Sequence, residues 1–389
     1  MKEIRKLYLF TFFRSFTCFA SISIAYYRSN ELSYFEIMLL QALYAIATAI
    51  LEIPSGMLSD MIGRKKTLLI GTFSFVGAYT CGALGSSMFP FIIMQVLGAV
   101  GQSCYSGTFL ALMYEDIEKD NSIQKSATQV FAILQTINLF SGLLASLLSV
   151  VIVKYFSMRS TYVITVLMYL LTLVVNFTLQ ERCEGAGVYQ GQYSVKRYFS
   201  IFWVSIKRIS NTGLITVFVD MIIFACFANT LLYMEQPILL DRHFPVEYFG
   251  GVTVVITVAT TIVLKFIGKI EEHIQNLQKF LKRITVFIIL MIISNLLIRT
   301  YIWGILTFLL LTIVIRIREI FILTEINRVI SNDVRATVMS IVSAIQMVGI
   351  SVLSIGIGYC EDISINFAIS VLALIITGAY VVLWKVLKN

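Results

Sequence analysis

Residues 56–66 read Gly56-Met-Leu-Ser-Asp60-Met-Ile-Gly63-Arg64-Lys65-Lys66 and lie between two long apolar runs, 35–58 and 67–85. The chain must reverse direction within a few residues here, and Gly63 can form a tight turn without a Cβ clash. Gly56 lets a neighbouring helix approach closely. Asp60 can pair with Arg64 or face the positive N-terminus of another helix. The stretch therefore predicts two antiparallel helices joined by a short basic turn.

The composition predicts that much of the chain faces lipid. Of its 389 residues, 58% are hydrophobic and only 13% are charged. A soluble domain carries roughly 25% charged residues, so this chain lacks the polar side chains that would cover a water-exposed surface. With about 20 apolar residues per membrane span, the length suits about twelve transmembrane helices.

Twelve apolar segments can be read along the chain. The first follows Lys2, Arg5 and Lys6, as a signal peptide would, but it is too long for a signal peptide and lacks a small-residue cleavage site, so we expect a retained anchor. The predicted segments are 7–27, 35–58, 67–85, 89–114, 128–153, 160–179, 212–238, 249–267, 284–302, 304–325, 337–359 and 365–384.

Lysine and arginine are distributed unevenly between the two sides of the predicted bundle. With the N-terminus placed in the cytoplasm, 21 of the 30 basic residues fall on the cytoplasmic side of the membrane and 5 on the opposite side. The other 4 lie within the predicted membrane segments. Cytoplasmic loops carry this excess in membrane proteins. The pattern therefore predicts that both termini are cytoplasmic, and the clusters explain the net charge of +8 without a nucleic-acid partner.

The longest polar interruption falls at the midpoint and divides the chain into two sets of six segments. We expect an N-terminal six-helix bundle at 1–180, a cytoplasmic linker at 181–211 and a C-terminal six-helix bundle at 212–389. Residues 195–210 place four basic side chains around an aromatic and apolar middle, which fits either an amphipathic helix on the membrane surface or a solvated linker. The predicted fold is all-α, with two six-helix pseudo-repeats around a central cavity.

The 56–66 turn resembles the signature G-x-L-a-D-r-x-G-r-k of the major facilitator superfamily. Gly56, Asp60, Gly63, Arg64 and Lys65 match it, and Met61 stands where the family has an arginine. The resemblance implies a transporter that alternates between inward- and outward-open states. It also implies that this turn latches the two halves on the cytoplasmic side in the outward-open state.

Other stretches are similar to the exporter branch of that superfamily. They are Leu51–Ser55, Ser106-Gly107 to Tyr114-Glu115, and Arg335–Ser340. Two marks of proton-coupled members are missing: Gln95 stands where the fourth helix usually carries an arginine, and the fifth helix lacks a Gly-Pro pair. The resemblance implies export coupled to proton entry, but these two positions lack the residues that usually mark it.

Five ionisable residues lie deep in predicted segments: Arg14, Asp220, Arg316, Arg318 and Glu319. Such residues cost at least about 2.5–3.5 kcal/mol at mid-membrane and mark functional sites. The resemblance implies that helices one, four, seven and ten line the central cavity. All five residues fall on those helices, and Gln95 and Gln102 add polar groups from helix four.

The positions of these residues along their helices predict which of them can form ion pairs. Arg316 and Glu319 can pair at i, i+3, whereas Arg318 points elsewhere. Asp220 lies among apolar residues, where burial favours the neutral form and lets it carry a proton. Arg14 is either the partner of Asp220 across the two halves or the ligand of a substrate anion.

Three arginines against two acids make the predicted cavity slightly positive. Arginine offers a planar fork of donors to carboxylate or phosphate, so a small amphipathic, anionic or zwitterionic substrate is favoured. The same charges could instead be ion pairs that lock the bundle.

Export is one of several functions that a chain with this many predicted membrane segments could have. The same fold could import a nutrient or organic anion, and a membrane receptor or enzyme is a further alternative. The sequence shows neither a catalytic cluster of His, Asp, Glu or Cys nor a GxxxxGK[ST] loop, so we expect neither an enzyme nor an ATP-driven pump. We expect no cofactor or metal, and a monomer in a bacterial cell membrane whose partners are lipid, protons and a small-molecule substrate.

Overall fold

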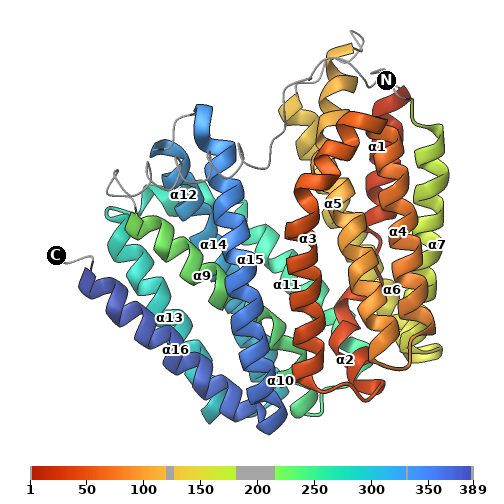
Figure 1. The fold of residues 1–389 in the computed structure, drawn as a ribbon. Helices are drawn as coiled ribbons and strands as arrows, with labels where there is room; N and C mark the ends of the chain where they lie inside the picture. Colours follow the sequence, from red (N-terminus) through yellow and green to blue (C-terminus); the bar gives the residue numbers. More distant parts are fainter. Residues whose placement is uncertain (1, 120–126, 181–214, 330–331, 387–389) are drawn as a thin grey trace. The chain divides into compact units, whose positions relative to one another are not determined.

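The structure, a computed structural model, describes residues 2–119, 127–180, 215–329 and 332–386, and these fold into helices (Figure 1). The expected linker with its amphipathic helix lies outside the described residues. The chain divides into two compact units. Unit 1 comprises Met1–Leu32, Leu43–Gln192 and Val246–Thr253, and unit 2 comprises Ser33–Ala42, Tyr193–Pro245 and Val254–Asn389.

Unit 1 is built around the first six predicted segments. Its elements are α1 (Lys2–Ser15), η1 (Ala20–Ile22), α2 (Ser23–Ser29), α3 (Tyr34–Ile62) from Leu43 onward, α4 (Arg64–Leu84), α5 (Met88–Lys119), α6 (Ala127–Tyr155), α7 (Met158–Thr178) and η2 (Val246–Tyr248). The first predicted segment is therefore not one continuous helix, because it breaks between α1 and η1.

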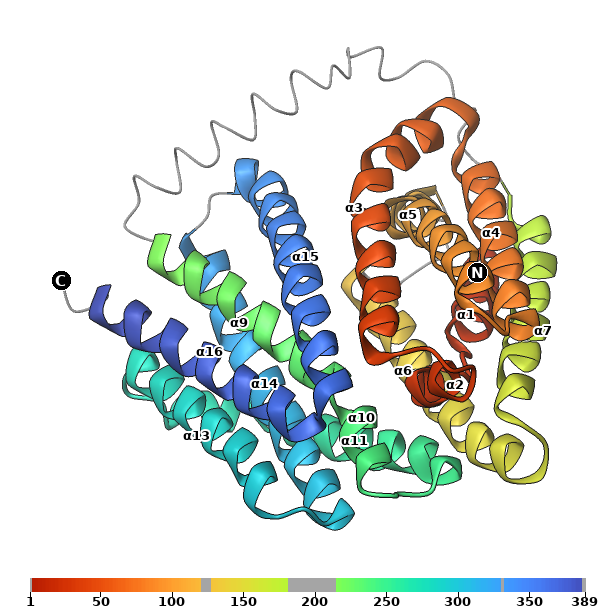
Figure 2. The same ribbon diagram turned by 60° about the horizontal axis from the view of Figure 1, so that its bottom comes forward.

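Unit 2 contains the later segments and the first turns of α3. Its helices are α9 (Ile215–Tyr233), α10 (Glu235–Asp241), α11 (Phe249–Leu264) from Val254 onward, α12 (Ile267–Glu272), α13 (Leu277–Leu297), α14 (Tyr301–Val329), α15 (Asn332–Ile363) and α16 (Ile365–Val386). Helices α13 and α16 pack along each other (Figure 2).

The ninth segment was predicted to begin at residue 284, but α13 begins at Leu277. The Asn276 side chain accepts a hydrogen bond from the Lys279 backbone N–H at 2.9 Å and caps the helix. Lys279, Lys282 and Arg283 occupy the first two turns, so the apolar pattern starts later than the helix does.

Eleven of the described helical stretches are long and apolar enough to cross a membrane. Helix α14 spans 29 residues but carries Arg316, Arg318 and Glu319 within its length. It supplies a further helix long enough to span, which agrees with the expected count of about twelve.

Helix α7 shows which solvent surrounds the bundle. Thr165, Thr172 and Asn176 are fully buried, whereas Leu167 and Val174 are 53% and 61% exposed. A soluble helix places its apolar face inward. Because α7 does the opposite, its outer face is suited to acyl chains.

Helices α4 and α5 approach each other closely at small residues (Figure 1). A Cβ atom added at Gly101 would lie 2.8 Å from the ring of Phe75, and one added at Gly71 would lie 2.9 Å from the Cβ of Cys104. Glycine at such a crossing lets two membrane helices pack backbone against side chain. This contact holds α5, which carries Gln95 and Gln102, against the rest of unit 1.

Gly101→Ala should lower the stability of the protein by about 1–3 kcal/mol, because the added methyl group overpacks the contact with Phe75. Gly107→Ala on the same helix is the matched control, since a Cβ there meets no atom within 4 Å. Thermal unfolding in detergent measures both variants. Equal unfolding temperatures for the two would contradict the close packing described here.

Candidate functional site

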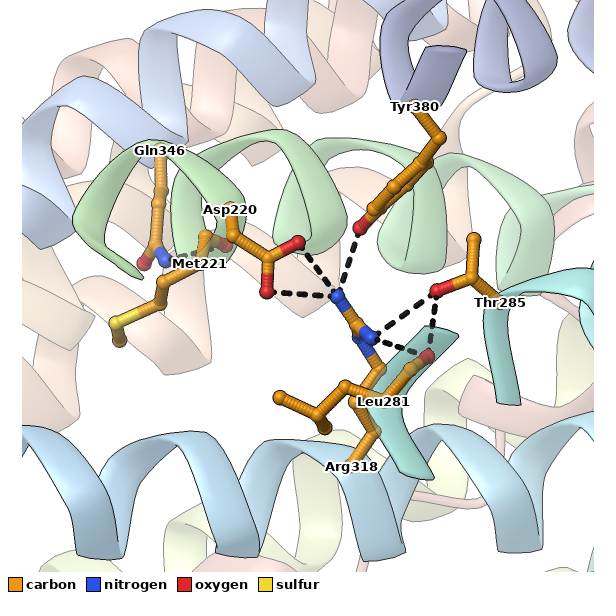
Figure 3. A network of polar contacts seen from close by, with 7 residues as sticks. All are labelled: Asp220, Met221, Leu281, Thr285, Arg318, Gln346 and Tyr380. Atoms are coloured by element: carbon orange, nitrogen blue, oxygen red, sulfur yellow. Dashed lines mark hydrogen bonds and ion pairs between the residues drawn. The ribbon is translucent and has the colours of Figure 1, made fainter. Parts of the chain in front are cut away.

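Arg318 is the centre of a polar network inside unit 2 (Figure 3). Its Nη2 atom lies 2.6 and 2.7 Å from the two carboxylate oxygens of Asp220 and 2.9 Å from the hydroxyl of Tyr380. Its Nη1 atom donates to the carbonyl of Leu281 and to the hydroxyl of Thr285, both at 3.1 Å. The network thus joins α9, α13, α14 and α16 through one guanidinium group.

The Asp220–Arg318 pair is buried and neutral as a whole. The Arg318 side chain is 1% exposed and that of Asp220 is 13% exposed. Phe224 covers the guanidinium carbon at 4.2 Å from its ring centre. Further hydrogen bonds help a buried ion pair to hold its geometry. Tyr380, Thr285 and Leu281 supply them to the two Nη atoms of Arg318, whereas its buried Nε atom has no hydrogen-bond partner in the described part of the chain.

The structure corrects one predicted pairing and confirms another. Asp220 was considered as a partner for Arg14, but it pairs with Arg318 of its own unit. Arg316 and Glu319 do form the predicted i, i+3 pair, at 2.9 Å, with side chains that are 52% and 35% exposed. Arg318, as predicted, points away from that pair.

Arg14 lies inside unit 1, next to polar and aromatic groups from α4 and α5. Its Nη2 atom donates to Gln102 Oε1 at 2.8 Å. The guanidinium carbon lies 3.4 Å from the ring centre of Tyr105 and 5.7 Å from that of Phe75. Its Nε atom is buried and donates no hydrogen bond. No acidic side chain among the described residues forms an ion pair with Arg14.

The two units therefore contain similar networks with different charge. In unit 1 an arginine of the first helix meets a residue of α5, the fourth predicted segment. In unit 2 an arginine of α14, the fourth helix of that half, meets a residue of α9, the first. The partner of Arg318 is the carboxylate of Asp220, whereas the partner of Arg14 is the neutral amide of Gln102. Within the part of the chain that the structure describes, Arg14 thus has no acidic partner.

Gln95 does not join the Arg14 group. It is 6% exposed and donates to the hydroxyl of Tyr27 at 3.2 Å. Tyr27 is itself buried and packs against Phe91. The structure therefore brings Arg14 and Gln102 together and places Gln95 in a separate contact with α2.

The turn between α3 and α4 has the geometry that its glycine predicts. Gly63 has a φ of 96°, which only glycine adopts without strain. Arg64 pairs with Glu115 at 2.6 Å and donates to the carbonyl of Ala111 at 2.6 Å. Lys65 donates to the carbonyl of Phe177 at 2.8 Å. The basic residues thus tie the turn to α5 and α7.

Two contacts predicted for this turn, an Asp60–Arg64 pair and a close helix approach at Gly56, are not seen among the described residues. Asp60 is exposed, and the acid paired with Arg64 is Glu115 rather than Asp60. A Cβ added at Gly56 would meet no atom within 4 Å, so the close helix approach predicted there is not seen.

Tyr380, Thr285 and Tyr105 take part in these networks and were not singled out from the sequence. Each lies in an apolar segment that offers many tyrosines and threonines. Only the partner helix, which the sequence does not specify, distinguishes them from the rest.

Comparisons with known proteins agree with this architecture. The chain is 24% identical over 332 residues to an uncharacterized transporter of Buchnera aphidicola, covering 81% of this chain and 78% of that protein. It is 30% identical over 119 residues to the chloramphenicol resistance protein CraA of Acinetobacter baumannii, covering 31% and 28% of the two chains.

Solved structures of transporters share the fold. The nucleoside transporter NupG matches with a TM-score of 0.73 and 13% identity, covering 98% of this chain and 97% of that one. A D-xylose-proton symporter matches with a TM-score of 0.71 and 15% identity, covering 98% and 96%. The fold is therefore that of a multi-pass membrane transporter.

The family follows from a match along most of the sequence. The model for the Major Facilitator Superfamily matches residues 7–354. This chain belongs to that family, and it is a membrane transporter that works by alternating access rather than an enzyme.

Arg318→Met should lower the stability by about 3–5 kcal/mol, because it leaves the carboxylate of Asp220 buried without its cation. Arg316→Met, two residues away on the same helix, should cost about 1 kcal/mol or less, since its pair is largely exposed. Thermal unfolding of the two purified variants measures the difference. A larger loss for Arg316→Met than for Arg318→Met would overturn the assignment of Arg318 as the centre of the unit 2 network.

Proposed function

We propose that this protein exports a small amphipathic molecule with an anionic or zwitterionic part, in exchange for protons. In this proposal Arg14 and Gln102 bind the charged part of the substrate. Asp220 or Glu319 carries the proton, and Arg316, Arg318 and Gln95 complete the pathway. The protein acts as a monomer in the bacterial cell membrane, with both termini in the cytoplasm.

The uncompensated charge of Arg14 is the observation that supports the substrate class. Arg316 and Arg318 are paired with Glu319 and Asp220, while the described residues around Arg14 offer it an amide and aromatic rings but no acid. Arg14 is partly buried and its Nε atom is fully buried, and a cation withdrawn from water without a counter-charge is unfavourable. A carboxylate or phosphate on the substrate would remove that cost and would use the free Nε donor of Arg14.

The aromatic surroundings of Arg14 suit an amphipathic ligand. Tyr105 stacks on Phe10 and Phe109, and Phe75 stacks on Tyr79. Ring faces beside a guanidinium group favour a substrate that has both an apolar body and an anion. Efflux as the direction is supported by the similarity to CraA, a chloramphenicol resistance protein.

The proposed role of Asp220 as the proton carrier rests on its ion pair with Arg318, which protonation of the carboxylate would break. Protonation removes the charge that binds Arg318, and the freed guanidinium group must then find other acceptors. Such a change alters how α9 and α14 are joined, as coupling between proton uptake and helix movement requires.

The substrate proposal is tested by anion transport in inverted membrane vesicles. Arg14→Gln should lower the uptake of an anionic or zwitterionic compound by about tenfold or more, since a hydrogen bond to a charged group contributes about 1.5–3 kcal/mol. Arg14→Lys should retain only part of the uptake, because lysine keeps the positive charge but lacks the planar guanidinium group that binds an anion with two N–H donors. Equal transport by Arg14→Gln and wild type, with normal folding, would exclude this anion site.

The coupling proposal is tested separately with the same vesicles. An uncoupler should abolish uptake by the wild type, and Asp220→Asn should lose the uncoupler-sensitive part, because an amide carries no proton. Substrate binding measured without a gradient shows whether the Asn variant is still folded. Normal uptake after either treatment would remove Asp220 from the proton pathway and leave Glu319 to be examined in the same way.

A further inference from the structure

Glu361 is a buried acid that the proposed substrate and proton pathways do not use. It lies near the end of α15, within the span Val342–Ile363, and is 3% exposed. Neither carboxyl oxygen has a hydrogen-bond partner in the structure. Among the described residues no lysine or arginine forms an ion pair with it.

The next residue, Asp362, has the opposite environment. Its carboxylate accepts hydrogen bonds from the backbone N–H groups of Tyr34 at 2.7 Å and of Phe35 at 2.9 Å. These groups form the first turn of α3, where the helix dipole favours a negative charge. Asp362 therefore joins α15 to the first turn of α3, and it is itself exposed.

Gly358, one turn before Glu361, lies on the face of α15 that packs on the same turns of α3. A Cβ added at Gly358 would lie 2.7 Å from Met38 and 2.9 Å from the carbonyl of Tyr34. Residues three apart share one face of a helix, so Glu361 lies next to this contact. The contact between α3 and α15 therefore helps to keep water away from the Glu361 carboxyl group.

The charge of Glu361 has no compensation at this position. A carboxylate without a donor in an apolar interior is strongly unfavourable, and the group avoids the penalty by binding a proton. The acid next to it, Asp362, places a second carboxyl group beside it on the same helix. A negative charge on Glu361 would be repelled by that of its neighbour.

We propose that Glu361 is a proton-binding site at the junction of α15 and α3. The carboxyl group is protonated while the Asp362 contact is closed, and it releases the proton when the contact opens and water reaches it. A role for this proton in the transport cycle rests on the proposed function. The protonation itself does not.

The site is tested by the apolar reagent dicyclohexylcarbodiimide, which reacts with protonated carboxyl groups in membranes. The purified protein in detergent is treated near neutral pH, digested, and analysed by fragment masses that separate positions 361 and 362. We expect one added carbodiimide on Glu361 and none on Asp362. Labelling of Asp362 without Glu361, or of neither residue, would overturn the proposal.

A stability measurement provides a second readout that does not depend on the reagent or on transport. Because the folded protein holds a proton that the unfolded chain releases, the unfolding temperature should fall as the pH is raised from about 6 to about 8. Glu361→Gln, which resembles the protonated side chain, should remove part of this fall. The matched variant Asp362→Asn should not. The same pH dependence in Glu361→Gln and wild type would contradict a proton on Glu361.

Discussion

The cost of an unpaired charge in a medium without water is the constraint on which the polar structure of this transporter depends. Hydrocarbon offers no hydrogen bonds, so each charged group inside the bundle must find a partner within the protein or in a ligand. Asp220 and Arg318 find each other and are surrounded by further donors and acceptors. Among the described residues, neither Arg14 nor Glu361 has a partner of opposite charge. We propose that an anion binds to Arg14 and that a proton binds to Glu361.

The two units share one arrangement of polar side chains. In each, an arginine joins the first and fourth helices near an aromatic ring: Arg14 beside Tyr105 in unit 1, and Arg318 beside Phe224 in unit 2. Replacing a carboxylate by an amide in one half leaves a single positive charge. In the proposed function this charge sets the substrate preference, while the Asp220–Arg318 pair maintains the packing of its own half.

Much of the fold was predictable because hydrocarbon imposes strong patterns on sequence. Apolar length predicted about twelve helices, and the 56–66 turn predicted the family. The Arg316–Glu319 pair followed from spacing along one helix. The partner of Asp220 did not, because it depends on which faces of α9 and α14 meet. Tyr380 and Thr285 come from two further helices for the same reason. Glu361 falls beyond the predicted segment 337–359, in what reads as a loop, and only its burial distinguishes it from Asp362.

The central claim is that Arg14 is neutralised by the substrate rather than by the protein. Its most direct measurement is an experimental structure of the transporter with a bound anionic or zwitterionic substrate. We expect the anionic group to lie within hydrogen-bond distance of the Arg14 guanidinium, with the Asp220–Arg318 pair in place or opened by protonation. A bound substrate whose anion lies elsewhere, with Arg14 paired to a carboxylate of the protein, would contradict this claim.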